Sequence, residues 1–191
     1  MKEEDRSTGY VKKGSTFYRP SSFFIFIIYI FSSCSPQAIL PVSNHGAYIE
    51  NVPFYAQETY QCGPAALAGV LNYWGVDVTP QEIAEEIFSE SARGTLTIDM
   101  VLYVQRKGLQ ANYYKGGIED IQIRIDDGFP VIILVDFGFM AYQVNHFIVV
   151  TGFNEYGVVV NSGKHQGQIL PWTDFEKAWK KTHYWTLLIN P

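Results

Sequence analysis

The stretch QETYQCGPAAL, from Gln57 to Leu67, constrains the fold more than any other part of this sequence. It leads from a polar turn into an apolar run, and the alanine, leucine and valine side chains of residues 65–71 have the spacing of a largely buried helix. Pro64 lies just inside the start of that helix, where its missing N–H costs nothing and its fixed φ is suitable. We therefore expect a buried helix over residues 62–73.

Cys62, one of only two cysteines in the chain, would be the first residue of this helix. Free backbone amides and the macrodipole stabilise negative charge at a helix N-terminus. A thiol in that position loses its proton more easily, and the thiolate is the nucleophilic form. A lone cysteine in a helix is more often an inert core residue, so a reactive Cys62 requires a partner elsewhere in the chain.

A base for Cys62 has to come from four histidines. His146 is distinguished from the others because it opens the hydrophobic run FIVVTG of residues 147–152, which is typical of a buried strand. A histidine at the mouth of such a strand is held rigidly, as a general base must be. A nucleophile and a base that lie far apart in sequence but adjacent in the fold are expected of a cysteine hydrolase.

Together, QETYQCGPAAL and the downstream NHFIVVTG resemble the C39-like branch of the papain-like cysteine peptidases, and the resemblance extends from about Val52 to Pro191. It implies that Cys62 is the nucleophile, that His146 is its base and that Gln57 donates a hydrogen bond to the oxyanion. It also implies an α+β papain-like fold, in which an N-terminal helical half packs on an antiparallel sheet half.

The position that orients the histidine departs from the family pattern. The family usually has an aspartate, sometimes an asparagine, at the end of the strand after the histidine strand. Here that strand reads GVVVNSG, without an acid. We favour Asn161, whose carbonyl oxygen could hold the imidazole, over Ser162, which would face the other way in a regular strand. If Ser162 faces His146 instead, the site is either a slow enzyme or a relic that only binds.

The remaining elements are expected to alternate in an α+β manner. Thr79 and Glu82 have the spacing of a capping box at a helix start, and glycines end two of the later helices. Besides the helix at 62–73, we expect helices at 80–88, 96–107, 118–127 and 174–179, and strands near 111–114, 131–135, 147–152, 158–161, 168–170 and 185–189.

The first part of the chain has the pattern of a targeting segment. A basic stretch precedes the nine apolar residues of Phe23–Phe31, and small residues then lead to Cys34. This order resembles a bacterial lipoprotein signal with Cys34 as the lipidated residue. We expect a signal at 1–34, a tether at 35–50 and the peptidase domain at 51–191, with the protein lipid-anchored in a bacterial envelope and facing the periplasm or the exterior.

Composition limits the classes of function. The chain has 191 residues, of which 47% are hydrophobic, enough for one core. A net charge of −5 without a basic cluster argues against nucleic-acid binding. CxxC, HExxH, P-loop and GxGxxG motifs are absent, so we expect no cofactor or metal.

The leading hypothesis is a peptidase that acts on a peptide or protein substrate. An acyltransferase or amidase would use the same residues, and a non-catalytic module that binds peptides is the alternative from a different class. The sequence does not define the oligomeric state.

Overall fold

The computed structural model describes residues 46–57 and 61–191. The predicted signal and most of the predicted tether, including Cys34, lie outside the described residues. Within the described part of the chain, no helix is long and apolar enough to cross a membrane.

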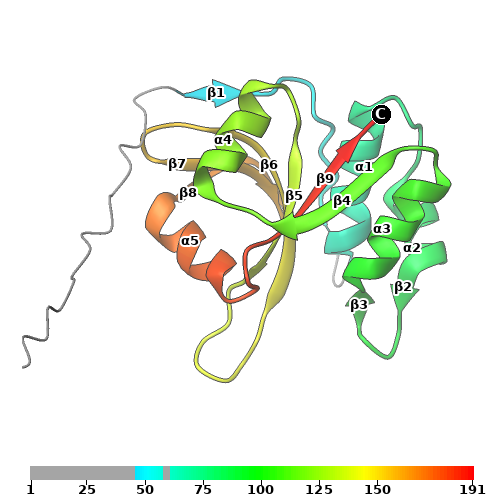
Figure 1. Cartoon of the computed structure of the whole chain (residues 1–191). Helices are drawn as coiled ribbons and strands as arrows, with labels where there is room; N and C mark the ends of the chain where they lie inside the picture. Colours follow the sequence, from blue (N-terminus) through cyan, green and yellow to red (C-terminus); the bar gives the residue numbers. More distant parts are fainter. Residues whose placement is uncertain (1–45, 58–60) are drawn as a thin grey trace, which may run out of the picture. The chain divides into compact units, whose positions relative to one another are not determined.

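The domain is organised around an antiparallel sheet with the strand order β4-β9-β5-β6-β7-β8, to which β1 adds by pairing with β6 (Figure 1). Its strands are β1 (Ala47–Tyr48), β4 (Gln110–Lys115), β5 (Val131–Asp136), β6 (Asn145–Phe153), β7 (Gly157–Ser162), β8 (His165–Pro171) and β9 (Trp185–Asn190). The three central strands β5, β6 and β9 are rich in valine, isoleucine and leucine, which suit a buried, pleated surface.

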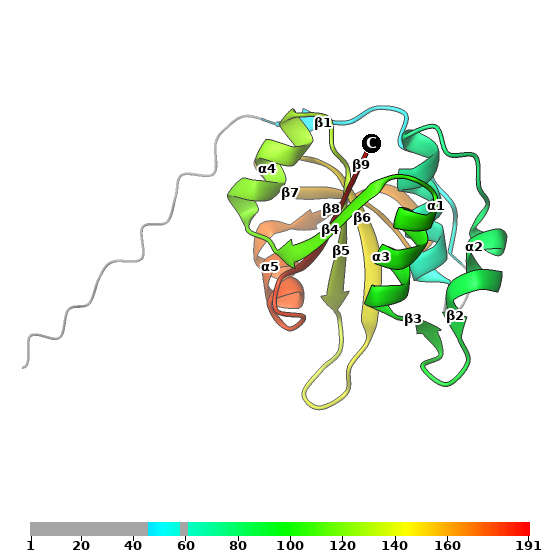
Figure 2. The same cartoon turned by 45° about the vertical axis from the view of Figure 1, so that its right-hand side comes forward.

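Five helices in the described residues cover this sheet: α1 (Cys62–Tyr73), α2 (Pro80–Ile87), α3 (Thr97–Arg106), α4 (Ile118–Asp126) and α5 (Trp172–Lys180). Helices α1, α2 and α3 gather on one side, whereas α4 and α5 lie on the other side in both views (Figures 1 and 2). The expected α+β papain-like layout, with a helical half packed on an antiparallel sheet half, is confirmed.

Helix α1 is embedded in the core as its apolar spacing predicts. Every residue from Gly63 to Leu71 is buried, and the helix packs on β6 and β5. Small residues allow this close packing: a methyl group added at Gly69 would lie 2.7 Å from the backbone oxygen of Pro53. The first turn of α1 is therefore held in place by the packing of the whole helix.

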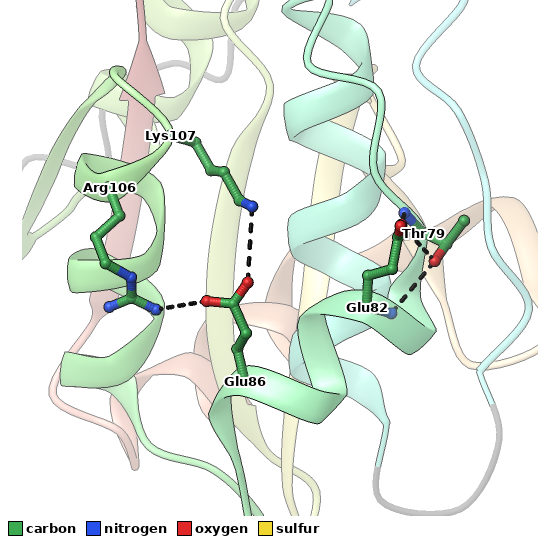
Figure 3. Close-up of polar contacts among 5 residues, drawn as sticks. All are labelled: Thr79, Glu82, Glu86, Arg106 and Lys107. Atoms are coloured by element: carbon green, nitrogen blue, oxygen red, sulfur yellow. Dashed lines mark hydrogen bonds and ion pairs between the residues drawn. The ribbon is translucent and has the colours of Figure 1, made fainter.

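Helices α2 and α3 are fixed by local polar contacts on their outer surface (Figure 3). The predicted capping box is present, because Thr79 Oγ1 accepts from the Glu82 amide at 3.2 Å and the Glu82 carboxylate accepts from the Thr79 amide at 2.7 Å. Glu86 on α2 forms exposed ion pairs with Arg106 at 3.1 Å and Lys107 at 3.7 Å, at the end of α3. Exposed pairs of this kind contribute little each, so they orient α2 and α3 more than they stabilise the fold.

Two features of the fold differ from the sequence prediction. The predicted tether at 35–50 overlaps the folded domain, since Ala47 and Tyr48 pair with Phe153 and Gly152 of β6 and Ile49 is buried. A second, unpredicted sheet is the hairpin of β2 (Phe88–Ser89) and β3 (Gly94–Thr95), which projects from the helical half (Figure 1). Two-residue strands carry no periodic signal, so neither was predicted.

Candidate active site

Cys62 and His146, the predicted nucleophile and base, line the same cavity of about 710 Å³. One wall is the β2–β3 hairpin and the residue after it, the opposite wall is the start of β6, and the turn between β7 and β8 closes a third side. The lining residues are Gln57, Cys62, Ala92, Arg93, Gly94, Thr95, Leu96, Val144, Asn145, His146, Phe147, Gly163 and Lys164.

Cys62 is the first residue of α1 and is partly buried against the core. Burial raises the pKa of its thiol, and this effect exceeds the opposing effect of hydrogen bonds from the backbone amides of Phe147, Gly63 and Cys62 itself. The expectation that the helix start would lower this pKa is therefore wrong in its net direction, because desolvation penalises the thiolate more than the amides favour it. The Phe147 contact also places the sulfur beside the residue that follows His146.

His146 lies near the start of β6, where the strand emerges from the core. Its backbone pairs with Val135 of β5, and its ring is half-buried beside Phe137, with ring centroids 6.1 Å apart. Burial lowers the pKa of the His146 imidazole. A thiol with a raised pKa and an imidazole with a lowered pKa rest as a neutral pair.

Ser162 is the side chain that holds the imidazole, since its Oγ lies 3.2 Å from His146 Nε2. The preference for Asn161 is wrong. Asn161 Oδ1 instead accepts a hydrogen bond from the Gly167 amide of β8 at 3.0 Å.

The strand register explains why Ser162, and not Asn161, contacts His146. Asn161 lies directly opposite Val149, so those two side chains share a face of the sheet. His146 is an odd number of residues from Val149 and therefore points to the other face, which is also the face of Ser162. A register one residue different would have reversed the assignment.

Gln57, the predicted oxyanion donor, also lines the cavity. Its backbone N–H donates to Gly163 O at 2.9 Å, which ties the segment before α1 to the β7–β8 turn. Its side-chain Oε1 is buried and has no hydrogen-bond partner among the described residues. Only the NH₂ end of this side chain could donate a hydrogen bond to a substrate oxygen.

Sequence reasoning missed the cavity residues that come from turns. Arg93, at the end of the β2–β3 turn, has φ of 50° and an exposed side chain, and Lys164 is exposed in the turn after Ser162. Phe137, beside the His146 ring, was missed as well. Turn residues carry no periodic pattern. The one signal that the sequence offered was nearness to a candidate site residue, as for Lys164, which lies shortly after Ser162.

The groups that the structure brings to this site are a thiol, an imidazole and amides. Among residues 46–57 and 61–191, no group of three or more His, Cys, Asp or Glu side chains could hold a metal ion. A sulfur nucleophile, an imidazole and amide donors together are able to transfer an acyl group.

Solved structures share this fold. A Bacillus anthracis protein assigned to the C39-like peptidases is 18% identical and has a TM-score of 0.63, covering 77% of this chain and 98% of that one. A double-glycine-motif protease from an AMS/PCAT transporter, solved with the leader peptide, is 23% identical with a TM-score of 0.62, covering 76% and 94%. The peptidase domain of Streptococcus ComA, a bifunctional ABC transporter of a quorum-sensing pathway, is 18% identical with a TM-score of 0.59, covering 74% and 99%.

Two comparisons concern the sequence itself. An uncharacterised protein of Methanothermobacter thermautotrophicus (strain Delta H) is 38% identical over 64 residues, which are 34% of this chain and 44% of that relative. The chain thus matches less than half of the length of that protein. The model of the Peptidase_C39 like family matches residues 49–186, most of the chain and all of the site described above. By this match, and with the fold in agreement, the chain belongs to the Peptidase_C39 like family.

Proposed function

We propose that this protein is a cysteine peptidase that hydrolyses peptide bonds with Cys62 as nucleophile and His146 as general base. The observation that carries the proposal is that the thiol and the imidazole line one cavity, with the Phe147 amide hydrogen-bonded to the sulfur. The transporter protease among the structural relatives was solved with a leader peptide, which supports a peptide substrate for this fold.

The contact of His146 with Ser162 supports a different role for each imidazole nitrogen. When Nε2 carries the hydrogen and donates it to Ser162 Oγ, the lone pair of Nδ1 is free to accept the Cys62 proton. The sulfur then attacks the substrate carbonyl carbon while Nδ1 takes the proton. Nδ1 later returns this proton to the leaving amine, and a water molecule activated by the same nitrogen hydrolyses the thioester.

The oxyanion formed in the attack needs hydrogen-bond donors. We assign this role to the backbone N–H of Cys62, which lies against the sulfur, and to the side-chain NH₂ of Gln57, which lines the same cavity. Donors fixed before the reaction begins are among the largest contributions to such catalysis. Transfer of the acyl group to an acceptor other than water, as in an acyltransferase or amidase, would use the same residues.

A second candidate function is a non-catalytic module that binds peptides in the same cavity. The contact of His146 with Ser162 favours it, because a hydroxyl stabilises an imidazolium less than a carboxylate does. The raised pKa of the Cys62 thiol points in the same direction.

A peptide library separates these two functions. The wild-type protein and Cys62→Ala are incubated with the same library, and products are identified by mass spectrometry. Cleavage by the wild type that is lost in Cys62→Ala supports the peptidase. Equal retention of peptides by both proteins without any cleavage supports the binding module.

We further propose that Cys34 is lipidated and anchors the protein in a bacterial envelope. The support is the sequence pattern alone, because residues 1–45 lie outside the described part of the chain. Each buried acyl CH₂ contributes roughly 0.8 kcal/mol to membrane attachment, so a multiply acylated chain resists washing with salt. Cys34→Ser should release the protein without changing the chemistry at Cys62. Recovery of the wild type with an unmodified N-terminus other than Cys34 contradicts the proposal.

A further inference from the structure

The charged side chains among the described residues that line the cavity have one sign. Arg93 belongs to the β2–β3 hairpin and Lys164 to the β7–β8 turn, so two cations line the cavity from different walls. Among the described residues that line the cavity, none is an aspartate or a glutamate. This local excess of positive charge stands in a chain whose net charge is −5.

The backbone segments that carry the two cations are tied to the segments that hold Cys62 and Gln57. The Arg93 amide donates to Glu90 O at 3.2 Å within the hairpin turn, and Thr95, two residues on, packs against Gly63, the neighbour of Cys62. Lys164 follows Gly163, whose carbonyl accepts from the Gln57 amide. Each cation is therefore linked through a few residues to the nucleophile or to the oxyanion donor.

Three other basic side chains of the domain are held in ion pairs. Arg106 and Lys107 pair with Glu86, and Arg124 pairs with Asp120. Arg93 and Lys164 form no ion pair with any described residue. The nearest acid in sequence to either is Glu90 in the hairpin turn, and its side chain does not line the cavity. The two charges are thus available to a ligand.

We infer that the cavity selects substrates that carry a carboxylate close to the scissile bond, with Arg93 and Lys164 binding it from either side. This inference rests on the proposed function for its reaction, but the electrostatic preference of the cavity exists independently of turnover. An aspartate or glutamate side chain of a peptide, or a terminal carboxylate, supplies the required charge. A guanidinium can bind a carboxylate through two hydrogen bonds, which adds direction to the attraction.

A pair of small thiol reagents tests the preference without any peptide. Iodoacetate and iodoacetamide alkylate Cys62 by the same displacement of iodide, but only iodoacetate carries a negative charge. Their two rate constants are measured in the full-length protein by mass spectrometry of the peptide containing Cys62, so that Cys34 does not contribute. The ratio of the iodoacetate to the iodoacetamide rate constant reports the field in the cavity and cancels changes in thiol reactivity.

We expect this ratio to fall roughly two- to fivefold in Arg93→Ala and in Lys164→Ala, as loss of one exposed charge pair implies. Lys180→Ala, which removes an exposed lysine of α5 outside the cavity, should leave the ratio unchanged. Raising the salt from about 10 mM to about 1 M should bring the wild-type ratio toward that of the two alanine variants, because the Debye length shrinks from about 30 Å to about 3 Å. Ratios equal to the wild type in both variants overturn the inference.

Matched peptides then separate the inference from the proposed function. Peptides that differ only by Glu or Gln beside the scissile bond should differ in kcat/KM, and Arg93→Glu should reverse the preference. If the alkylation ratio falls but no peptide is cleaved, the acidic-ligand cavity stands and the peptidase proposal fails. If peptides are cleaved without any preference for Glu and the ratio is unchanged, the peptidase stands and this inference fails.

Discussion

The two halves of the domain hold their reactive residues in different ways. Cys62 begins a helix whose next nine residues, Gly63 to Leu71, are all buried, so its position follows from the packing of the core. His146 lies near the exposed start of β6, between exposed Asn145 and buried Phe147. Its ring is held by strand pairing, by Phe137 and by one contact with Ser162.

This difference indicates which substitutions the site tolerates. The position of Cys62 depends on many apolar contacts and is lost only when the helix is disturbed. The orientation of the His146 ring depends on a few contacts, of which Ser162 supplies a hydrogen bond, and can be adjusted without unfolding the protein. We therefore expect substitutions in α1 to have all-or-none effects on the site, and substitutions around His146 to change its activity by degrees.

The largest effect should come from removal of the nucleophile. Cys62→Ala should lower kcat/KM by at least about 1,000-fold while leaving the fold intact, since residues that form a covalent intermediate cannot be replaced by their neighbours. Activity is measured on any peptide that the wild type cleaves, and the fold by circular dichroism. A variant that keeps most of its activity would show that Cys62 is a packing residue.

The next effect concerns stability of the helical half. Gly69→Ala should destabilise the domain by about 1–3 kcal/mol, because the added methyl group meets the Pro53 backbone oxygen, which cannot move aside. By helix propensity alone, alanine would stabilise a helix interior relative to glycine. A loss of stability in Gly69→Ala would therefore be due to packing.

Urea unfolding measures this change. Gly117→Ala is the control for a methyl group that meets no atom within 4 Å; since Gly117 is the N-cap of α4, only the smaller cost of a poorer cap residue is expected there. Equal midpoints for Gly69→Ala and the wild type would mean that α1 is less tightly packed than described.

A smaller effect is expected on the side of the base. Ser162→Ala should lower kcat about tenfold, with little change in KM or in stability, because the imidazole loses its orienting contact but keeps its place in β6. Asn161→Ala should instead lower stability through the lost bond to the Gly167 amide. The reverse pattern, with kcat reduced mainly in Asn161→Ala, would return the orienting role to Asn161.

The smallest effect is a displacement of the pH profile. Burial lowers the pKa of His146 below its ordinary value of 6.5. The imidazole therefore remains neutral, and able to accept a proton, from high pH down to this lowered pKa. The acid limb of kcat/KM should consequently lie below pH 6.5. Ser162→Asp should move it upward by about one unit or more, because a nearby carboxylate favours the imidazolium. An acid limb above pH 7 in the wild type would contradict the assignment of His146 to a desolvated site.

The sequence predicted the parts of this molecule that depend on local pattern. Helix α1 follows from the apolar spacing after Pro64, and the capping box of α2 from Thr79 and Glu82. The expectation that Cys62 and His146 act together needed both motifs, since either residue alone would be only a buried side chain; the structure places both in the lining of one cavity.

The remainder depends on distant parts of the chain. Whether Asn161 or Ser162 faces His146 is decided by the register of β7 on β6, which a one-residue slip would reverse. The pKa of Cys62 is decided by the total burial of its thiol and not by its place at a helix start. Strand β1 exists only because β6 offers an edge to Ala47 and Tyr48.

The raised pKa of Cys62 has a consequence for the lifetime of the protein. Hydrogen peroxide oxidises thiolates to sulfenic acid and reacts far more slowly with thiols. A cysteine that stays protonated until a substrate arrives is therefore protected from oxidation during the time that it is idle. The same burial that makes the Cys62 thiol a weaker nucleophile therefore also preserves it.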